Sequence, residues 1–198
     1  MVRSNSSAVR SLQVEHAEMF VVACLGNPGK KYARNRHNIG FIIGEHLAAR
    51  KGVTIGSTPF GARACRCVED GKEMLLIFPQ EYMNCSGVAV RKVLDYYRVP
   101  AERLIVVHDD IELPFGEIRV KFNGGHKGHN GIRSIAAELG TAGFHRLRFG
   151  VGRPADEHQS VADHVLSDFT ADEYEAIRGM LPAAAERIVS LVSEMGVS

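Results

Sequence analysis

The apolar residues of this chain include continuous runs that are typical of buried β-strands. Residues 20–25 and 104–107 are apolar at nearly every position, as in strands covered on both faces. Two further runs, 62–68 and 74–78, flank the turn-like residues 69–72 and predict a hairpin. Four strands are therefore expected within residues 20–107.

Two later segments alternate instead of running continuously. Apolar and basic residues take turns along 118–122 and again along 146–151. This period of two is typical of a strand with one exposed face. Both strands place arginine or lysine side chains on that face.

Helical spacing appears between the strands. Apolar residues three and four positions apart predict helices over 37–51, around 90–97 and over 131–139. The last forty residues also read as helical, with breaks expected near 169–170 and at Pro182.

Strands that alternate with helices indicate an α/β fold. We expect one domain over residues 19–198, with a central mixed, twisted sheet flanked by helices and a helical C-terminal segment. Residues 1–18 are polar and precede the first strand pattern, so they predict a flexible extension. The sequence contains no internal repeat, low-complexity tract or linker that would suggest a second domain.

Composition limits the function classes. The 198 residues are 45% hydrophobic and 24% charged, as in a globular protein, and no apolar run has the length of a membrane span. The N-terminus lacks the apolar stretch of a signal peptide. Four cysteines in such a chain imply reduced thiols. A cytoplasmic protein without a membrane partner is expected.

Charge is distributed unevenly although the net charge is only +1. Residues 112–153 carry 7 Lys/Arg against 3 Asp/Glu, whereas residues 154–198 carry 2 against 9. The basic excess lies in segments that also hold polar motifs. This arrangement leaves room for a polyanion beside those motifs, although a charge bias is also typical of a solvated face.

Three polar motifs follow predicted strands directly. They are Gly26-Asn27-Pro28-Gly29, His108-Asp109-Asp110 and the glycine-rich segment 123–131. Open α/β sheets place their sites in loops at strand ends. Neither the Walker A nor the G-x-G-x-x-G spacing is present, so the first motif could also be a plain tight turn.

His37 and Asp109 are the candidates for acid–base chemistry. An imidazole titrates near neutral pH and can take a proton from water, provided that a partner holds one tautomer. Asp109 could be that partner, as in hydrolytic triads. Asp109 and Asp110 should point to opposite faces of extended chain, so only one can turn inward. The competing interpretations are a helix-start histidine and a turn aspartate.

Other polar residues can each be interpreted in two ways, as structural or as functional. Asn84 and Asn130 precede predicted helices and are natural N-caps, but an amide can also bind a peptide backbone. His126 and His129 suggest zinc, yet no second pair stands at ligand spacing, so no metal is expected. Covalent catalysis is disfavoured because the G-x-S-x-G elbow is absent.

The ordered set of motifs resembles the bacterial-type peptidyl-tRNA hydrolase family from about residue 20 to the C-terminal helices. The matching residues are Gly26-Asn27-Pro28-Gly29, Tyr32, Arg36-His37-Asn38, Tyr82-Met83-Asn84, His108-Asp109 and Gly128-His129-Asn130-Gly131. The resemblance implies a monomeric enzyme without a cofactor, which cleaves the ester between a peptide and the 3′ ribose of its tRNA.

The resemblance also implies roles for individual residues. His37 would activate water, Asp109 would orient His37, and Asn27 would position the substrate. Tyr32 would lie beside the 3′-terminal nucleotide, and Asn84 and Asn130 would bind the peptide. The remaining implied contacts are Met83 and His129 with the substrate, and Arg119, Lys121, Lys127 and Arg148 with the tRNA. Residues 156–166 would cover the cleft.

Several positions depart from the family pattern. Phe78 and Glu81 stand where the family usually has Lys and Thr, Lys127 replaces a common Gly, and so does Cys24. None removes a residue implied in catalysis. Two other functions stay open at this point, an RNA-binding protein of the same fold without hydrolysis and an unrelated small-molecule or peptide hydrolase.

Overall fold

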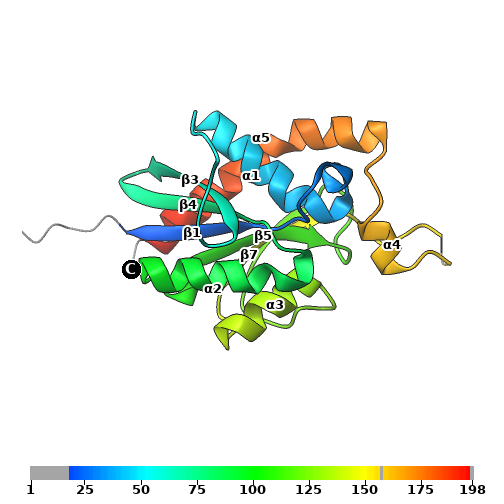
Figure 1. The fold of residues 1–198 in the computed structure, drawn as a ribbon. Helices are drawn as coiled ribbons and strands as arrows, with labels where there is room; N and C mark the ends of the chain where they lie inside the picture. Colours follow the sequence, from blue (N-terminus) through cyan, green and yellow to red (C-terminus); the bar gives the residue numbers. More distant parts are fainter. Residues whose placement is uncertain (1–17, 157, 197–198) are drawn as a thin grey trace, which may run out of the picture.

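A computed structural model describes residues 18–156 and 158–196. Seven strands form one sheet in the order β2-β3-β4-β1-β5-β7-β6 (Figure 1). Their bounds are β1 Met19–Cys24, β2 Gly56–Ser57, β3 Ala62–Glu69, β4 Lys72–Pro79, β5 Leu104–Asp110, β6 Ile118–Phe122 and β7 His145–Gly150. The expected extension lies outside the described residues, apart from Glu18.

The sheet is mixed, as predicted. Strand β1 runs parallel to both β4 and β5, and β5 runs parallel to β7. The hairpin partners β3 and β4 are antiparallel, as are β6 and β7 at the other edge. The carboxyl ends of β1, β4 and β5 therefore lie side by side, where these three strands end.

Helices cover both faces of the sheet. Helices α1 (Ile39–Arg50) and α5 (Ala171–Met195) lie on one face, and α2 (Ser86–Tyr97) and α3 (Asn130–Leu139) lie on the other (Figure 1). Side chains alternate along β1 and β5 between the two layers, because successive residues of a strand point to opposite faces. The short helix α4 (Val161–Val165) precedes α5.

Four 3-10 turns complete the described structure: Lys30–Tyr32, Arg36–Asn38, Met83–Cys85 and Ala101–Arg103. Among the described helices, none is both long and apolar enough to cross a membrane.

The structure corrects two expectations about elements. Pro182 does not break the last helix, because Ile177, Leu181 and Ala185 on either side of it are buried in the core and hold α5 continuous. Strand β2 was not anticipated, since two exposed residues, Gly56 and Ser57, carry no apolar pattern.

Close contact between backbones fixes the start of α1. A Cβ added to Gly40 would lie 2.4 Å from the carbonyl oxygen of Val107 and 2.5 Å from that of Leu25, so only glycine fits there. The amide of Phe41 also donates to the Leu25 carbonyl at 3.1 Å. The 3-10 turn Arg36–Asn38, directly before α1, is thereby brought to the ends of β1 and β5.

Candidate active site

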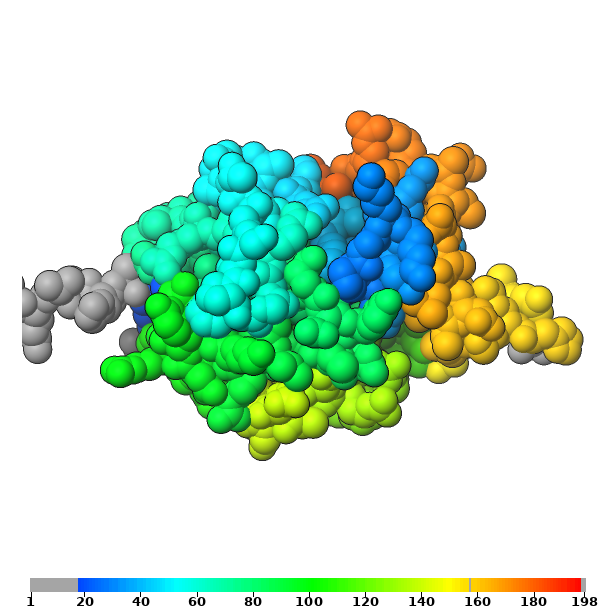
Figure 2. All heavy atoms as spheres, in the orientation of Figure 1, coloured from blue at the N-terminus to red at the C-terminus, as the bar shows by residue number. Residues whose placement is uncertain are grey.

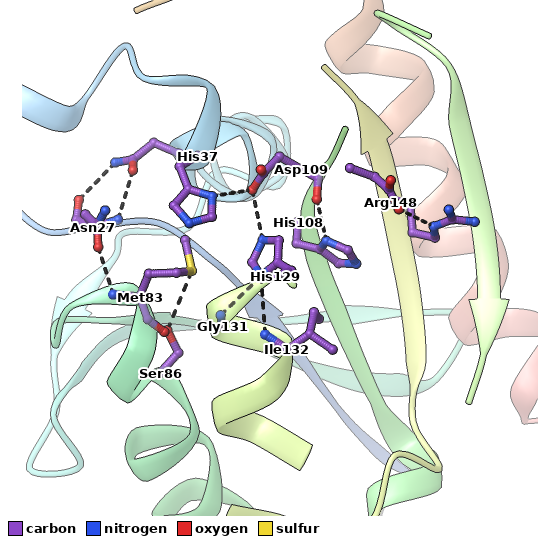
Figure 3. A network of polar contacts seen from close by, with 12 residues as sticks. Asn27, His37, Met83, Ser86, His108, Asp109, His129, Gly131, Ile132 and Arg148 are labelled. Carbon is purple, nitrogen blue, oxygen red and sulfur yellow. Dashed lines mark hydrogen bonds and ion pairs between the residues drawn. The ribbon is translucent and has the colours of Figure 1, made fainter. Parts of the chain in front are cut away.

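His37 and Asp109 meet at the carboxyl ends of the parallel strands (Figure 3). His37 comes from the 3-10 turn Arg36–Asn38, and Asp109 comes from β5. His37 Nδ1 lies 2.8 Å from Asp109 Oδ1, although 72 positions separate the two residues. Both side chains are buried. The predicted pairing is confirmed, and it leaves His37 Nε2 as the nitrogen available to a reactant.

His129 donates to the same carboxylate oxygen. Its Nε2 lies 3.0 Å from Asp109 Oδ1, while its Nδ1 accepts hydrogen bonds from the amides of Gly131 and Ile132. Because Nδ1 accepts, the proton of the neutral ring must be on Nε2. Asp109 Oδ1 thus accepts two N–H groups, from histidine rings whose centroids are 4.8 Å apart, and this fixes its position.

Neither Asn84 nor Asn130 is an N-cap, which was the alternative to substrate binding that the sequence left open. His129 caps α3, and Asn130 is the first residue of that helix, exposed, with Oδ1 accepting from Arg133. Cys85 takes the N-cap position of α2 without a side-chain hydrogen bond, so Asn84 does not cap that helix. The amides of Asn84 and Asn130 are therefore not committed to helix ends. The two segments pack together, since the turn Met83–Cys85 contacts α3.

The pair of His37 and Asp109 carries one negative charge, on Asp109. Burial favours the neutral acid at Asp109, but the neighbouring imidazoles of His37 and His129 outweigh it and hold the pKa of Asp109 well below its usual range. Burial also disfavours a charged His37, yet the Asp109 carboxylate raises the pKa of His37 above its usual value. An ionised Asp109 is thus ready to stabilise the imidazolium that forms when His37 takes a proton.

The two residues that flank Asp109 point to the other face of the strand, as expected. Asp110 accepts from Arg148 Nε at 2.7 Å. His108 Nδ1 donates to the Asp109 carbonyl at 2.6 Å, and burial lowers the pKa of His108 to about 3. His108 is therefore a neutral imidazole stacked edge-on to His129, with ring centroids 4.7 Å apart. The sequence motif contained His108 but gave no sign of this packing.

Asn27 ties three loops together. Its Oδ1 accepts from the amide of Met83 at 2.8 Å, and its backbone exchanges two hydrogen bonds with the Asn38 amide group, each 2.9 Å (Figure 3). Met83 is buried beneath this tie, and Tyr32 contacts Tyr82 edge-on nearby. Asn38 was part of a motif, but its role in fixing the loop beside His37 was not predicted.

Arg36 fastens the neighbouring residue to the C-terminal segment. Its guanidinium pairs with Glu173 of α5 at 2.6 Å and donates to Ser167 Oγ and the Asp168 carbonyl. Asn35 adds a hydrogen bond to Asp168 at 2.6 Å. The 3-10 turn that carries His37 is therefore held from both ends. Since these contacts join residues more than 130 positions apart, no local signal could have revealed them.

A cavity of about 510 Å³ opens beside His37. It lies between the glycine-rich segment, the ends of β5 and β7, and α4, which lines it with Val161, Ala162 and Val165. This placement agrees with the expectation that residues 156–166 cover the cleft. Its basic lining residues are Lys121, Lys127, Arg146, Arg148 and Arg153.

The predicted tRNA contacts are only partly brought together. Lys121, Lys127 and Arg148 line the cavity, whereas Arg119 is exposed outside it and pairs with Glu117. Arg148 is itself paired with Asp110. Arg146, which was not a candidate, is buried and donates to the carbonyls of Gly124 and Gly125, so it anchors the glycine-rich segment.

The site also contains a set of groups that could bind a metal ion, namely those of His37, Asp109 and His129. Their ligand atoms lie within 4.8 Å of one another. A metal bound at His129 Nε2 would move that proton to Nδ1, which would have to give up its hydrogen bonds from Gly131 and Ile132. The hydrogen-bond pattern therefore fits a proton-transfer site better than a metal centre.

Fold and site together define a class: α/β proteins in which a histidine–aspartate pair can activate water beside a basic cavity. The comparisons with known proteins are specific within it. The family model described as peptidyl-tRNA hydrolase matches residues 21–197, so the chain belongs to the peptidyl-tRNA hydrolase family.

Relatives and solved structures agree. The chain is 40% identical to a peptidyl-tRNA hydrolase of Geobacter sulfurreducens, covering 87% of this chain and 89% of the relative. It is 42% identical to that of Carboxydothermus hydrogenoformans, covering 89% and 93%. A crystal structure of peptidyl-tRNA hydrolase from Acinetobacter baumannii superimposes with a TM-score of 0.78 at 35% identity, covering 91% of this chain and 90% of the other.

Proposed function

We propose that this chain hydrolyses the ester between a peptide and the 3′ ribose of its tRNA, and so recycles tRNA from aborted translation. Family membership supports the reaction. The observation that carries the mechanism is the hydrogen bond between His37 Nδ1 and Asp109, since it leaves Nε2 free at the wall of a basic cavity.

In the proposed mechanism, His37 Nε2 takes a proton from a water molecule that attacks the ester carbonyl carbon. Asp109 stabilises the resulting imidazolium. The tetrahedral intermediate then collapses, its bond to the ribose oxygen breaks, and the imidazolium returns the proton to that oxygen. The products are a peptide carboxylic acid, which ionises, and a tRNA with a free 3′ hydroxyl.

The substrate contacts are proposed from placement. Asn27, Asn84 and Asn130 are assigned to position the peptide and to stabilise the oxyanion, and Asn130 lines the same cavity as His37. Met83, whose amide donates to Asn27, and His129, which caps the helix that begins at Asn130, hold these residues in place. Tyr32 offers a ring for the terminal nucleotide. Phosphate contacts are assigned to Lys121, Lys127 and Arg148 in the cavity and to Arg119 at its outside edge. Such contacts are largely indifferent to base sequence, which suits an enzyme that accepts many tRNAs.

Cleavage of N-acetyl-aminoacyl-tRNA tests this function. We expect wild-type protein to release the tRNA, and His37→Ala to lower kcat by at least about 10²-fold, the usual share of a general base. His46→Ala, on the far part of α1, is the matched control. A folded His37→Ala protein with the wild-type rate would remove His37 from the mechanism.

The same assay separates the alternatives. Salt-sensitive tRNA binding without ester cleavage would favour an RNA-binding protein, and cleavage of acyl esters that lack RNA would favour a small-molecule hydrolase. We also propose that residues 19–198 act as one domain in a cytoplasmic monomer, since the substrate arises from translation. Sedimentation of the pure protein tests the monomer.

A further inference from the structure

A second cavity, of about 290 Å³, lies on the other side of the loop that carries Asn27. It is bounded by residues 27–33, by the exposed side of α1 and by the ends of β3 and β4. Figure 2 shows the surface hollowed between the blue loop of residues 28–34 and the cyan-to-green chain around residues 60–80. None of the basic residues of the first cavity lines it.

The two cavities meet at the active site. His37 lines the basic cavity, whereas the next residue, Asn38, lines the second one together with Asn27. The mutual hydrogen bonds of Asn27 and Asn38 form the partition between them. An ester held at His37 therefore has one recess on each side, of which the larger is basic.

Asn27 presents a free donor at this partition. The residue is only 6% exposed, and its Oδ1 and backbone groups are bonded to Met83 and Asn38. Its Nδ2 has no hydrogen-bond partner among the described residues. This nitrogen is not among the fully buried polar atoms that lack a partner, so it is accessible to a ligand at the partition. A peptide carbonyl in the second cavity would accept its hydrogen bond.

The lining of the second cavity has mixed character. Phe41 and Ile42 of α1 supply apolar surface, and Lys30 adds a positive charge at the rim. Glu45 of α1 and Arg63 of β3 form an ion pair with 3.7 Å between Nη2 and Oε1. Both side chains of the pair are about half exposed, at 48% and 39%. A cavity that offers apolar surface and both signs of charge suits a peptide of varied sequence, not a polyanion.

We propose that the second cavity is a subsite for the peptide residues that precede the ester-linked one, and that Glu45 and Arg63 set its tolerance of charge. An acidic peptide side chain pairs there with Arg63, and a basic one pairs with Glu45. Removing either partner leaves the other free, so each change favours one sign of substrate charge. This inference rests on the proposed function.

The experiment compares three substrates on one tRNA, each with the same ester-linked residue. One carries only an N-acetyl group, and the other two carry tripeptides with Asp or Lys next to that residue. For each enzyme, kcat/KM of each tripeptide substrate is divided by that of the N-acetyl substrate. A variant that merely disturbs folding lowers all three values together and leaves these ratios unchanged.

Opposite shifts are expected from the two neutralising variants. Glu45→Gln should favour the Asp substrate over the Lys substrate by about threefold relative to wild type, and Arg63→Gln should favour the Lys substrate by about as much, as suits a half-exposed pair. An obstructing variant, Ala33→Trp, should lower both tripeptide ratios about tenfold. Ala49→Trp, exposed on α1 outside the cavity, is its control.

The outcomes are distinct. Ratios that stay at the wild-type value in Glu45→Gln, Arg63→Gln and Ala33→Trp, with the N-acetyl substrate still cleaved, would overturn the subsite and leave the proposed function standing. Failure of wild-type protein to cleave even the N-acetyl substrate would overturn the proposed function, and the subsite with it.

Discussion

At the scale of single residues, the site is organised by one oxygen atom. Asp109 Oδ1 accepts hydrogen bonds from both His37 and His129. The cap of α3 forces the tautomer of His129, and the carboxylate forces that of His37. Hydrogen bonds within the protein therefore determine that His37 Nε2 is the nitrogen free to react.

His129→Phe should change the basicity of His37. Without the second donor, Asp109 concentrates its charge on His37, so the pKa of His37 should rise further above its usual value. NMR titration of the His37 ring measures this, and the pH–rate profile should move in the same direction, because only the neutral ring can act as the base. His126→Phe, in the same loop, is the control. An unchanged or lower pKa of His37 would contradict the shared-oxygen account.

His108 should make the protein sensitive to acid. Its pKa is about 3 in the folded chain and near 6.5 when unfolded, so the unfolded state binds more protons between these values. The free energy of unfolding should therefore fall as pH drops from 6.5 towards 3, by up to about 1.4 kcal/mol per pH unit from this group.

Urea unfolding at a series of pH values tests this. His108→Gln should flatten the dependence between pH 6.5 and 3, while His158→Gln, at an exposed imidazole, should keep the wild-type slope. Asp109, whose pKa is lowered in the folded chain, also makes the free energy of unfolding fall in acid, but only at and below the usual pKa of an aspartate. His37, whose pKa is raised, makes the free energy of unfolding rise as the pH falls. The comparison of variant with wild type isolates His108, and an equal slope in both would refute its assignment.

At the scale of elements, tertiary packing decides what local propensity does not. Continuous apolar runs identified β1 and β5, and helical spacing identified α1, α2 and α3. The continuity of α5 through Pro182 was missed, because the buried residues around it outweigh a proline that lies on the exposed side.

Pro182→Ala should stabilise the protein. Proline cannot donate to the carbonyl of Arg178, and its ring crowds that turn, at a cost of up to about 3 kcal/mol in a helix interior. We expect the free energy of unfolding to rise by about 1–3 kcal/mol, measured by chemical denaturation. Ala183→Ser, on the exposed neighbour, should stay within about 0.5 kcal/mol of wild type. A destabilised Pro182→Ala protein would show that α5 needs the proline.

At the scale of the whole molecule, sequence patterns predicted the reactive residues but not how they are assembled. The strand-end motifs and the family resemblance indicated His37, Asp109 and the asparagines. Sequence patterns could not reveal that His129 caps a helix while bonding Asp109, or that Arg36 reaches Glu173, because both depend on side-chain directions and on distant contacts. The pairing of Arg148 with Asp110 was hidden for the same reason.

The basic cavity should make substrate binding depend on salt. Each phosphate neutralised by a lysine releases counterions, so KM for an acyl-tRNA should rise with salt on a log–log plot. Lys121→Gln should reduce that slope by about one, with little change in kcat. Lys92→Gln, exposed on α2, is the control. A slope equal to that of wild type in Lys121→Gln would place the tRNA elsewhere.

The clamp between Arg36 and the segment Ser167–Glu173 has a consequence for biosynthesis. A ribosome makes His37 and Asp109 well before Glu173, so the emerging chain holds its reactive groups before it holds the contact that aligns them. An unfinished copy should therefore be inert towards the linkage that still tethers it to its own tRNA. Hydrolytic activity should appear only after α5 has been made.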